Sequence, residues 1–187
     1  MVLYQIILLL HILGALALFM GLGFEWLCLR RINSATSKVQ LKEWINFLAS
    51  LKVIFSISGI TILLSGIYMS VITWGGPGWI IVAFVGLVTS AINGSVITGR
   101  KIEALQKVIN EDDTKQMPNI FEQKKNQKLF SHFQLRSAIS LCIIFLMTFK
   151  PELVVSISAF VLAIVLGSLP ILSFNKETNT GLAETDN

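Results

Sequence analysis

Apolar and polar residues occur in long alternating blocks along the chain. A helix rises about 1.5 Å per residue, so about 20 apolar residues cross the roughly 30 Å hydrocarbon core of a bilayer. Stretches of this length and character cover residues 2–29, 52–73, 79–99, 132–149 and 152–172. The pattern predicts an all-α polytopic membrane protein, built as a bundle of five transmembrane helices.

The polar segments divide the rest of the chain into two connections and a tail. Residues 1–174 are expected to form a single membrane domain, because the connections 34–50 and 100–131 are too short and too polar to build cores of their own. Both connections are expected to contain helix. The tail, 175–187, is polar and is predicted to be disordered.

The first connection carries a helix start signal. Ser37 is followed three residues later by Gln40, as in a capping box. Apolar residues then recur on one face, opposite charged residues such as Lys42 and Glu43. This pattern predicts an amphipathic helix that either lies at the membrane interface or runs straight into the second span.

The distribution of charge predicts how the five helices are oriented. The chain of 187 residues is 53% apolar and 14% charged, with 15 Lys and Arg against 11 Asp and Glu. Most basic residues lie in or beside the two long connections, which share a side with the C-terminus when the number of spans is odd. The positive-inside rule makes that side cytoplasmic and leaves the N-terminus outside. We expect the basic residues to contact anionic lipid headgroups, and we expect no nucleic acid as a partner.

Small residues recur at helical spacing on two of the predicted spans. Helices in membranes pack closely where small side chains let their backbones approach. The residues are Gly86, Ser90 and Gly94 on the third span and Ala159, Ala163 and Gly167 on the fifth. They predict tight helix packing, either within the chain or between copies in a homo-oligomer.

Ionisable and small residues share one face on each of the first two spans. Charged side chains inside a membrane usually face the protein interior. On the first span this face holds His11, Gly14, Leu18, Gly21, Glu25 and Cys28. On the second span it holds Lys52, Ser56, Gly59, Leu63, Gly66 and Ser70. Both faces are therefore expected to point into the bundle.

Several ionisable residues are expected at one depth, at the cytoplasmic rim of the bundle. They are Glu25, Lys52, Arg100, His132 and Arg136. In one interpretation they form ion pairs that fix the helix ends and touch lipid phosphate. In the other they line a pocket for a lipid headgroup. There Arg100 and Arg136 would bind a phosphate or carboxylate, with Glu25 or His132 nearby for proton transfer.

His11 lies away from that rim, within the first span and nearer the outer surface. Three roles fit it: a hydrogen bond within the bundle, ligation of a haem or metal, or contact with a proton or quinone. His132 lies at the opposite rim, so the two imidazoles are too far apart to ligate one haem or one metal ion. No metal site is predicted.

Two short motifs resemble a known group of proteins. The run LLHILGA at residues 9–15, followed by Gly21, resembles the first helix of small bacterial membrane proteins. That group includes the copper-resistance CopD domain and the HemJ-type protoporphyrinogen oxidase. The run FLMTFKP at 145–151 is similar to the end of the fourth helix in uncharacterised members. The resemblance implies a multi-pass protein of the bacterial cytoplasmic (inner) membrane, and it implies haem binding at His11 by analogy with the HemJ-type enzyme.

The functional expectation follows from what the spans contain. No catalytic motif is recognisable, so we expect an accessory or binding protein for a small hydrophobic or redox ligand, a lipid or a membrane partner. The alternative is a haem-binding oxidoreductase of the HemJ type that uses His11. A transporter or channel is disfavoured, because only Asn93 and scattered Ser and Thr offer polarity at mid-membrane depth.

Overall fold

The computed structural model describes residues 2–110 and 128–183, and every element within these ranges is helical. The chain begins with α1 (Val2–Ser34) and α2 (Lys38–Met69). A short π-helix, η1 (Ser70–Trp74), extends α2. The helix that follows is built from α3 (Gly78–Ile92), a second π-helix η2 (Asn93–Thr98) and α4 (Gly99–Asn110). The last two helices are α6 (Lys128–Phe149) and α7 (Leu153–Ala183).

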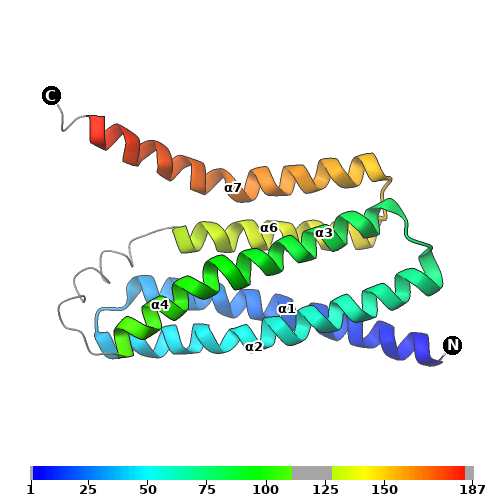
Figure 1. Cartoon of the computed structure of the whole chain (residues 1–187), viewed down its shortest axis with the longest axis horizontal. Coiled ribbons are helices and arrows are strands. Elements are labelled where there is room, and N and C mark those ends of the chain that lie inside the picture. The colour runs from blue at the N-terminus through cyan, green and yellow to red at the C-terminus, as the bar shows by residue number, and fades with distance from the viewer. Residues whose placement is uncertain (1, 111–127, 184–187) are drawn as a thin grey trace.

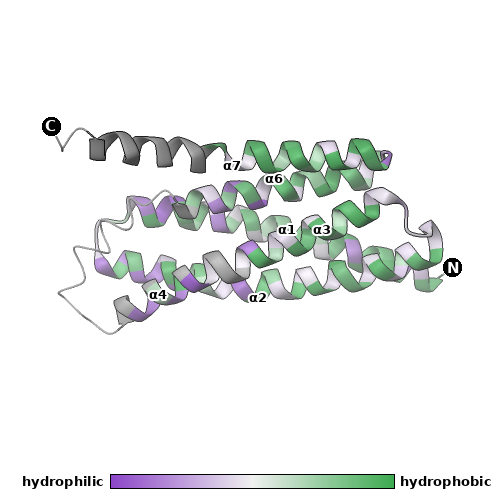
Figure 2. Ribbon diagram, turned by 45° about the horizontal axis from the view of Figure 1, so that its top comes forward, coloured by the Kyte–Doolittle hydropathy of each residue, from purple (hydrophilic) through white to green (hydrophobic). Residues whose placement is uncertain are grey.

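Successive helices run in opposite directions along one long axis, so their ends gather at the two ends of the molecule (Figure 1). The N-terminus lies at the same end as the η1–α3 turn and the α6–α7 turn. We term this the Trp end, after Trp74 and Trp79. The α1–α2 turn, the end of α4 and the start of α6 lie at the opposite end. We term it the charged end, because hydrophilic residues concentrate towards it (Figure 2).

Within the described parts of the chain, three helical segments are long and apolar enough to cross a membrane. They are Val2–Ser34, Lys38–Trp74 and Phe130–Phe149. The apolar helices Gly78–Ile92 and Leu153–Leu169 are shorter. The all-helical class predicted from the sequence is therefore confirmed, together with three helices capable of spanning a bilayer.

The helices are longer than the predicted spans, chiefly at the charged end. α2 begins at Lys38 and, together with η1, covers residues 52–73, so the amphipathic segment runs straight into the second span. Ser37 is its N-cap, and the Ser37 hydroxyl accepts a hydrogen bond from the Gln40 N–H at 3.3 Å. The backbone of α7 is helical as far as Ala183, into the predicted tail. Residues 111–127, within the predicted connection, lie outside the described residues, as do 184–187.

The two turns at the Trp end are joined by a cation–π contact. Gly75 and Gly76 reverse the chain with φ of 65° and 76°, a region that favours glycine. At the other turn Lys150 has φ of 48°. Its ammonium lies 4.0 Å from the ring centroid of Trp74, which in turn packs edge-on against Trp79. This contact links the η1–α3 turn to the α6–α7 turn.

The buried core consists of two clusters, one towards each end. The cluster at the charged end is formed by α1, α2, the turn between them and α4: Cys28, Leu29, Ala35, Leu41, Ile45, Leu48, Leu51 and Ile102. The second cluster joins α3, α6 and α7 through Val82, Ala83, Cys142, Leu146 and Ala163. Each end of the bundle is thus held by a different set of helices.

Small residues allow close approach within the chain. A Cβ at Gly86 would lie 3.2 Å from the Phe160 ring of α7, and one at Gly167 would lie 2.7 Å from the Leu135 Cα of α6. Ala163 is buried in the second cluster, and Ala159 packs against that cluster. These residues therefore serve α3–α7 and α6–α7 packing within one molecule.

Candidate functional site

Two cavities lie between α2 and α3, where these helices contact each other at few points. The charged-end cavity has a volume of about 490 Å³ and the Trp-end cavity about 370 Å³. Leu63 of α2 and Leu87 of α3 line both, so the cavities adjoin each other at these two residues. Both volumes fall within the roughly 300–1,000 Å³ typical of sites for small ligands. We term the two cavities together the α2–α3 seam.

The small and polar face predicted for the second span lines this seam. Lys52, Ser56, Gly59 and Leu63 contribute to the wall of the charged-end cavity. Farther along α2, Leu63, Gly66 and Ser70 line the Trp-end cavity. The residues of this face from Gly59 to Ser70 are partly buried, as the predicted inward orientation requires, whereas Lys52 and Ser56 are exposed. The face borders a cavity instead of packing on another helix. α2 packs on α1 through a neighbouring face, where a Cβ at Gly14 would lie 3.1 Å from Ile62.

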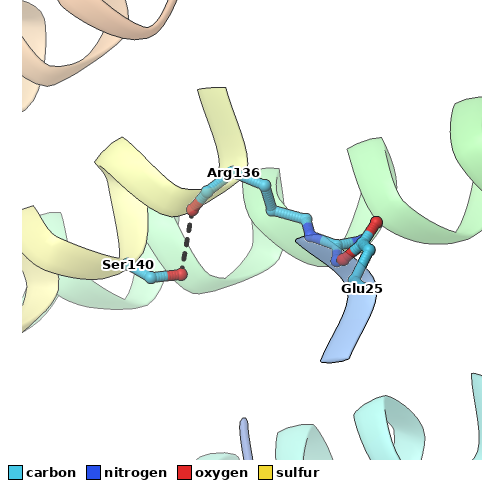
Figure 3. A network of polar contacts seen from close by, with 3 residues as sticks. All are labelled: Glu25, Arg136 and Ser140. Atoms are coloured by element: carbon cyan, nitrogen blue, oxygen red, sulfur yellow. Dashed lines mark hydrogen bonds and ion pairs between the residues drawn. The ribbon is translucent and has the colours of Figure 1, made fainter. Parts of the chain in front are cut away.

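A buried ion pair lies in the wall of the charged-end cavity. Arg136 of α6 donates a hydrogen bond from Nη2 to Oε2 of Glu25 on α1 (Figure 3). Only 8% of the arginine side chain and 2% of the glutamate side chain are exposed. Both residues also line the cavity. Removing one partner of such a pair leaves an uncompensated buried charge, which is strongly unfavourable.

Besides Glu25, two neighbours fix the position of the Arg136 side chain. The guanidinium carbon lies 4.5 Å from the ring centroid of Phe55 on α2. The same ring packs on Gly21, where an added Cβ would lie 2.9 Å from Phe55 Cε1. On the other side, a Cβ at Gly94 would lie 2.5 Å from Arg136 Nη1. Gly21 and Gly94 thus leave the space that Phe55 and Arg136 occupy.

A second, exposed set of polar contacts ties α2 to α4 at the charged end. Lys52 Nζ donates to Glu103 Oε1 at 2.8 Å, and both side chains are 60% exposed. The Gln106 amide donates to Asn46 Oδ1 at 2.9 Å. The hydrogen bond and the positive charge of Lys52 lower the pKa of the Glu103 carboxyl. Lys52, Glu103 and Gln106 also line the charged-end cavity.

The structure separates the five ionisable residues predicted at the cytoplasmic rim. Glu25, Lys52 and Arg136 line one cavity. Arg100, in the first turn of α4, is exposed, and His132, in α6, is partly buried. Neither belongs to the cavity wall. Within the wall, the interpretation as ion pairs describes the contacts, because Glu25 is joined to Arg136 and Lys52 to Glu103.

His11 lies in the wall of the Trp-end cavity. Its Nδ1 is 2.9 Å from the Ser65 hydroxyl of α2, and that hydroxyl also lies 3.2 Å from the Ile62 carbonyl oxygen. If the Ser65 proton goes to a backbone carbonyl, Nδ1–H of His11 is the donor and Nε2 carries a lone pair. Gly66 faces the ring, since a Cβ there would lie 3.4 Å from His11 Cε1.

The two histidines lie at opposite ends of the bundle. His11 is in the part of α1 nearer the Trp end, whereas His132 is near the start of α6 at the charged end (Figure 1). One haem or metal ion cannot be ligated by both. Among the side chains that the structure describes, no three His, Cys, Asp or Glu residues come together as ligands of a metal ion would.

Three residues that shape the seam have no distinctive sequence signal. Phe55 and Leu87 are ordinary apolar residues of spans, and Glu103 is one of several charges on a polar helix. Each acquires its role from a neighbour on another helix, which helical periodicity within one segment does not reveal. Comparison with protein-family models, curated proteins and solved structures finds no match. The functional proposal therefore rests on the geometry of the α2–α3 seam.

Proposed function

We propose that this chain is a five-span protein of the bacterial cytoplasmic membrane that binds a lipid-like ligand in the α2–α3 seam. For the spans, α3 and η2 form one continuous helix of about 30 Å, and the apolar part of α7 has a length of about 25 Å. Added to the three longer helices, these lengths support five crossings. The excess of basic residues at the charged end supports a cytoplasmic position for that end.

The single observation that carries the binding proposal is the pair of adjoining cavities. Along α2 and η1, the seam extends from Leu48 to Trp74, a distance of about 39 Å. This length lies between the roughly 30 Å of a hydrocarbon core and the roughly 40–45 Å of a bilayer with its headgroup regions. Most wall residues are apolar, whereas charged residues occur only in the charged-end cavity. A molecule with a long apolar chain and a polar headgroup has the same distribution of polarity.

The arrangement of the helices supports entry from the bilayer. α2 and α3 contact each other at few points, and both cavities are partly open. A lipid-like molecule would therefore enter sideways between these helices and place its headgroup near Lys52 and Arg136. Its chain would extend past Leu63 and Leu87 towards the Trp end.

Native mass spectrometry of the protein released from defined vesicles tests this proposal. Gly59→Leu adds a side chain to the wall of the charged-end cavity, at a position where a Cβ has no neighbour within 4 Å. Gly23→Leu is the matched control, since Gly23 is exposed on α1, also has no neighbour within 4 Å and lines neither cavity. The proposal predicts retained lipid in the wild type and in Gly23→Leu, and loss of that lipid in Gly59→Leu. Equal retention in all three proteins would contradict it.

The Trp-end cavity supports a second candidate, haem ligated by His11. The observation in its favour is the contact between Nδ1 and Ser65, because a ligating histidine usually donates its other ring N–H to an oxygen. His11 would hold the haem, and the haem would supply redox chemistry next to the apolar wall. A Soret band in the purified protein that disappears in His11→Ala is the expected result. A colourless wild-type protein would eliminate this candidate.

A further inference from the structure

The charged side chains of the charged-end cavity are balanced in number and already paired. Among the side chains that the structure describes, its wall contains two cations and two carboxylates: Arg136, Lys52, Glu25 and Glu103. We propose that this cavity selects a lipid whose headgroup carries no net charge, either zwitterionic or uncharged. This inference rests on the proposed lipid-binding function and differs from the phosphate or carboxylate ligand expected from the sequence.

The buried pair opposes an anionic headgroup. Arg136 is the more deeply buried of the two cations, 8% exposed against 60% for Lys52, and Glu25 already accepts its hydrogen bond. An anion that bound Arg136 would either displace Glu25 or add a second negative charge beside it. Displacement would leave a carboxylate that is 2% exposed without its cation. The guanidinium is also confined between Phe55 and Gly94 and has little room to move towards a new partner.

The exposed pair of Lys52 and Glu103 also opposes an anionic headgroup. Lys52 lies 2.8 Å from Glu103, so an anion approaching the ammonium also meets a carboxylate. A zwitterion, by contrast, places an anionic group near each cation and a cationic group near each carboxylate. An uncharged headgroup avoids both repulsions.

Hydroxyl groups in the wall suit a net-neutral headgroup. Ser56, Ser90 and Thr98 line the cavity, and each hydroxyl can both donate and accept a hydrogen bond. They come from α2, α3 and η2, so they lie on both sides of the α2–α3 seam. These groups offer polar contacts to alcohols, carbonyls and amines without favouring either sign of charge.

The test uses vesicles that contain phosphatidylethanolamine, diacylglycerol, phosphatidylglycerol and cardiolipin in known proportions. Native mass spectrometry identifies the lipids that remain bound and distinguishes a zwitterionic from an uncharged lipid by mass. The wild type should be enriched in one of the two net-neutral lipids relative to the vesicles. Glu25→Gln leaves Arg136 without its carboxylate and should raise the ratio of anionic to neutral bound lipid about tenfold, because charge-assisted hydrogen bonds are stronger than neutral ones.

Two further variants keep the test decisive. Glu43→Gln removes a carboxylate from an exposed position of α2 outside the cavity, and it should leave the lipid ratio unchanged. If Glu25→Gln alone fails to fold, Glu25→Gln combined with Arg136→Gln removes both charges and should retain the preference for neutral lipid. A shift of that double variant towards anionic lipid would contradict the proposal.

The possible failures are distinguishable. Enrichment of phosphatidylglycerol or cardiolipin in the wild type would overturn the headgroup inference and leave the lipid-binding proposal intact. An unchanged lipid ratio in folded Glu25→Gln would also overturn the inference. Lipid in proportion to the vesicle composition, with no enrichment, would instead contradict the proposed function itself.

Discussion

The two cavities lie in the same seam between α2 and α3, but their walls differ in chemistry. The charged-end cavity contains a buried ion pair, an exposed ion pair and several hydroxyls. The Trp-end cavity is apolar except for His11, Ser70 and the polar edges of two tryptophans. Under the proposed function, polar contacts in one cavity and apolar packing in the other would recognise the two parts of an amphiphile.

Removing one ionisable side chain from each cavity should give the largest difference in stability between the variants of the two cavities. Arg136→Ala strands the Glu25 carboxylate, and we expect it to lower the free energy of unfolding by about 3–5 kcal/mol. His11→Ala loses one hydrogen bond to Ser65 and should lower it by about 1 kcal/mol. Denaturant titration in detergent micelles, followed by circular dichroism, measures both values.

A double variant shows whether the large effect comes from the uncompensated charge. Glu25→Gln combined with Arg136→Gln should recover much of the stability lost in Arg136→Ala, because no buried charge remains. Equal destabilisation by Arg136→Ala and His11→Ala would contradict the proposed difference between the two cavities.

Adding one methyl group to a glycine in each cavity should give a smaller difference in stability between the two variants. Gly94→Ala places a Cβ 2.5 Å from Arg136 Nη1, and the guanidinium is held by Glu25 and Phe55. We expect a destabilisation of about 1–3 kcal/mol, as for other overpacked sites. Gly66→Ala places its Cβ at an ordinary 3.4 Å from His11 and should be neutral or slightly stabilising. Thermal unfolding of both variants checks this, and a larger loss in Gly66→Ala would reverse the comparison.

Removing the exposed ion pair of Lys52 and Glu103 should have the smallest effect on stability. Lys52→Met removes the hydrogen bond and charge that lower the pKa of Glu103, so this pKa should rise towards its ordinary value of 4.5. Because the pKa is lowered in the folded protein, the pair contributes stability above pH 4.5 and loses it as the pH falls through the lowered pKa. Carbon-detected NMR of labelled glutamate measures the titration. An unchanged Glu103 pKa in Lys52→Met would show that the contact is absent in solution.

Helical periodicity predicted the parts of this fold that depend on one segment at a time. The apolar blocks located the helices, and Ser37 marked the start of α2. The part of the second-span face from Gly59 to Ser70 was correctly expected to point inwards, whereas Lys52 and Ser56 are exposed. Its small residues fix that orientation, because glycine and serine leave space at positions where larger side chains would fill it.

Pairing between helices could not be predicted in the same way. The contacts of Arg136 with Glu25 and Phe55 join α6 to α1 and α2, and the partner of Lys52 comes from α4. Periodicity indicates which residues share a face, but the choice of neighbour depends on how all the helices pack together. The same limitation applies to the cavities, because they form where α2 and α3 diverge.

Site-specific photo-crosslinking tests most directly whether the α2–α3 seam holds a selected lipid. A photoreactive benzoyl-phenylalanine replaces either Leu63, which lines both cavities, or its neighbour Leu64, which is 63% exposed. After irradiation in mixed-lipid vesicles, mass spectrometry identifies the crosslinked lipid at each position. We expect one enriched, net-neutral lipid at position 63 and a mixture that reflects the vesicles at position 64. The same mixture at both positions would contradict selective binding in the seam.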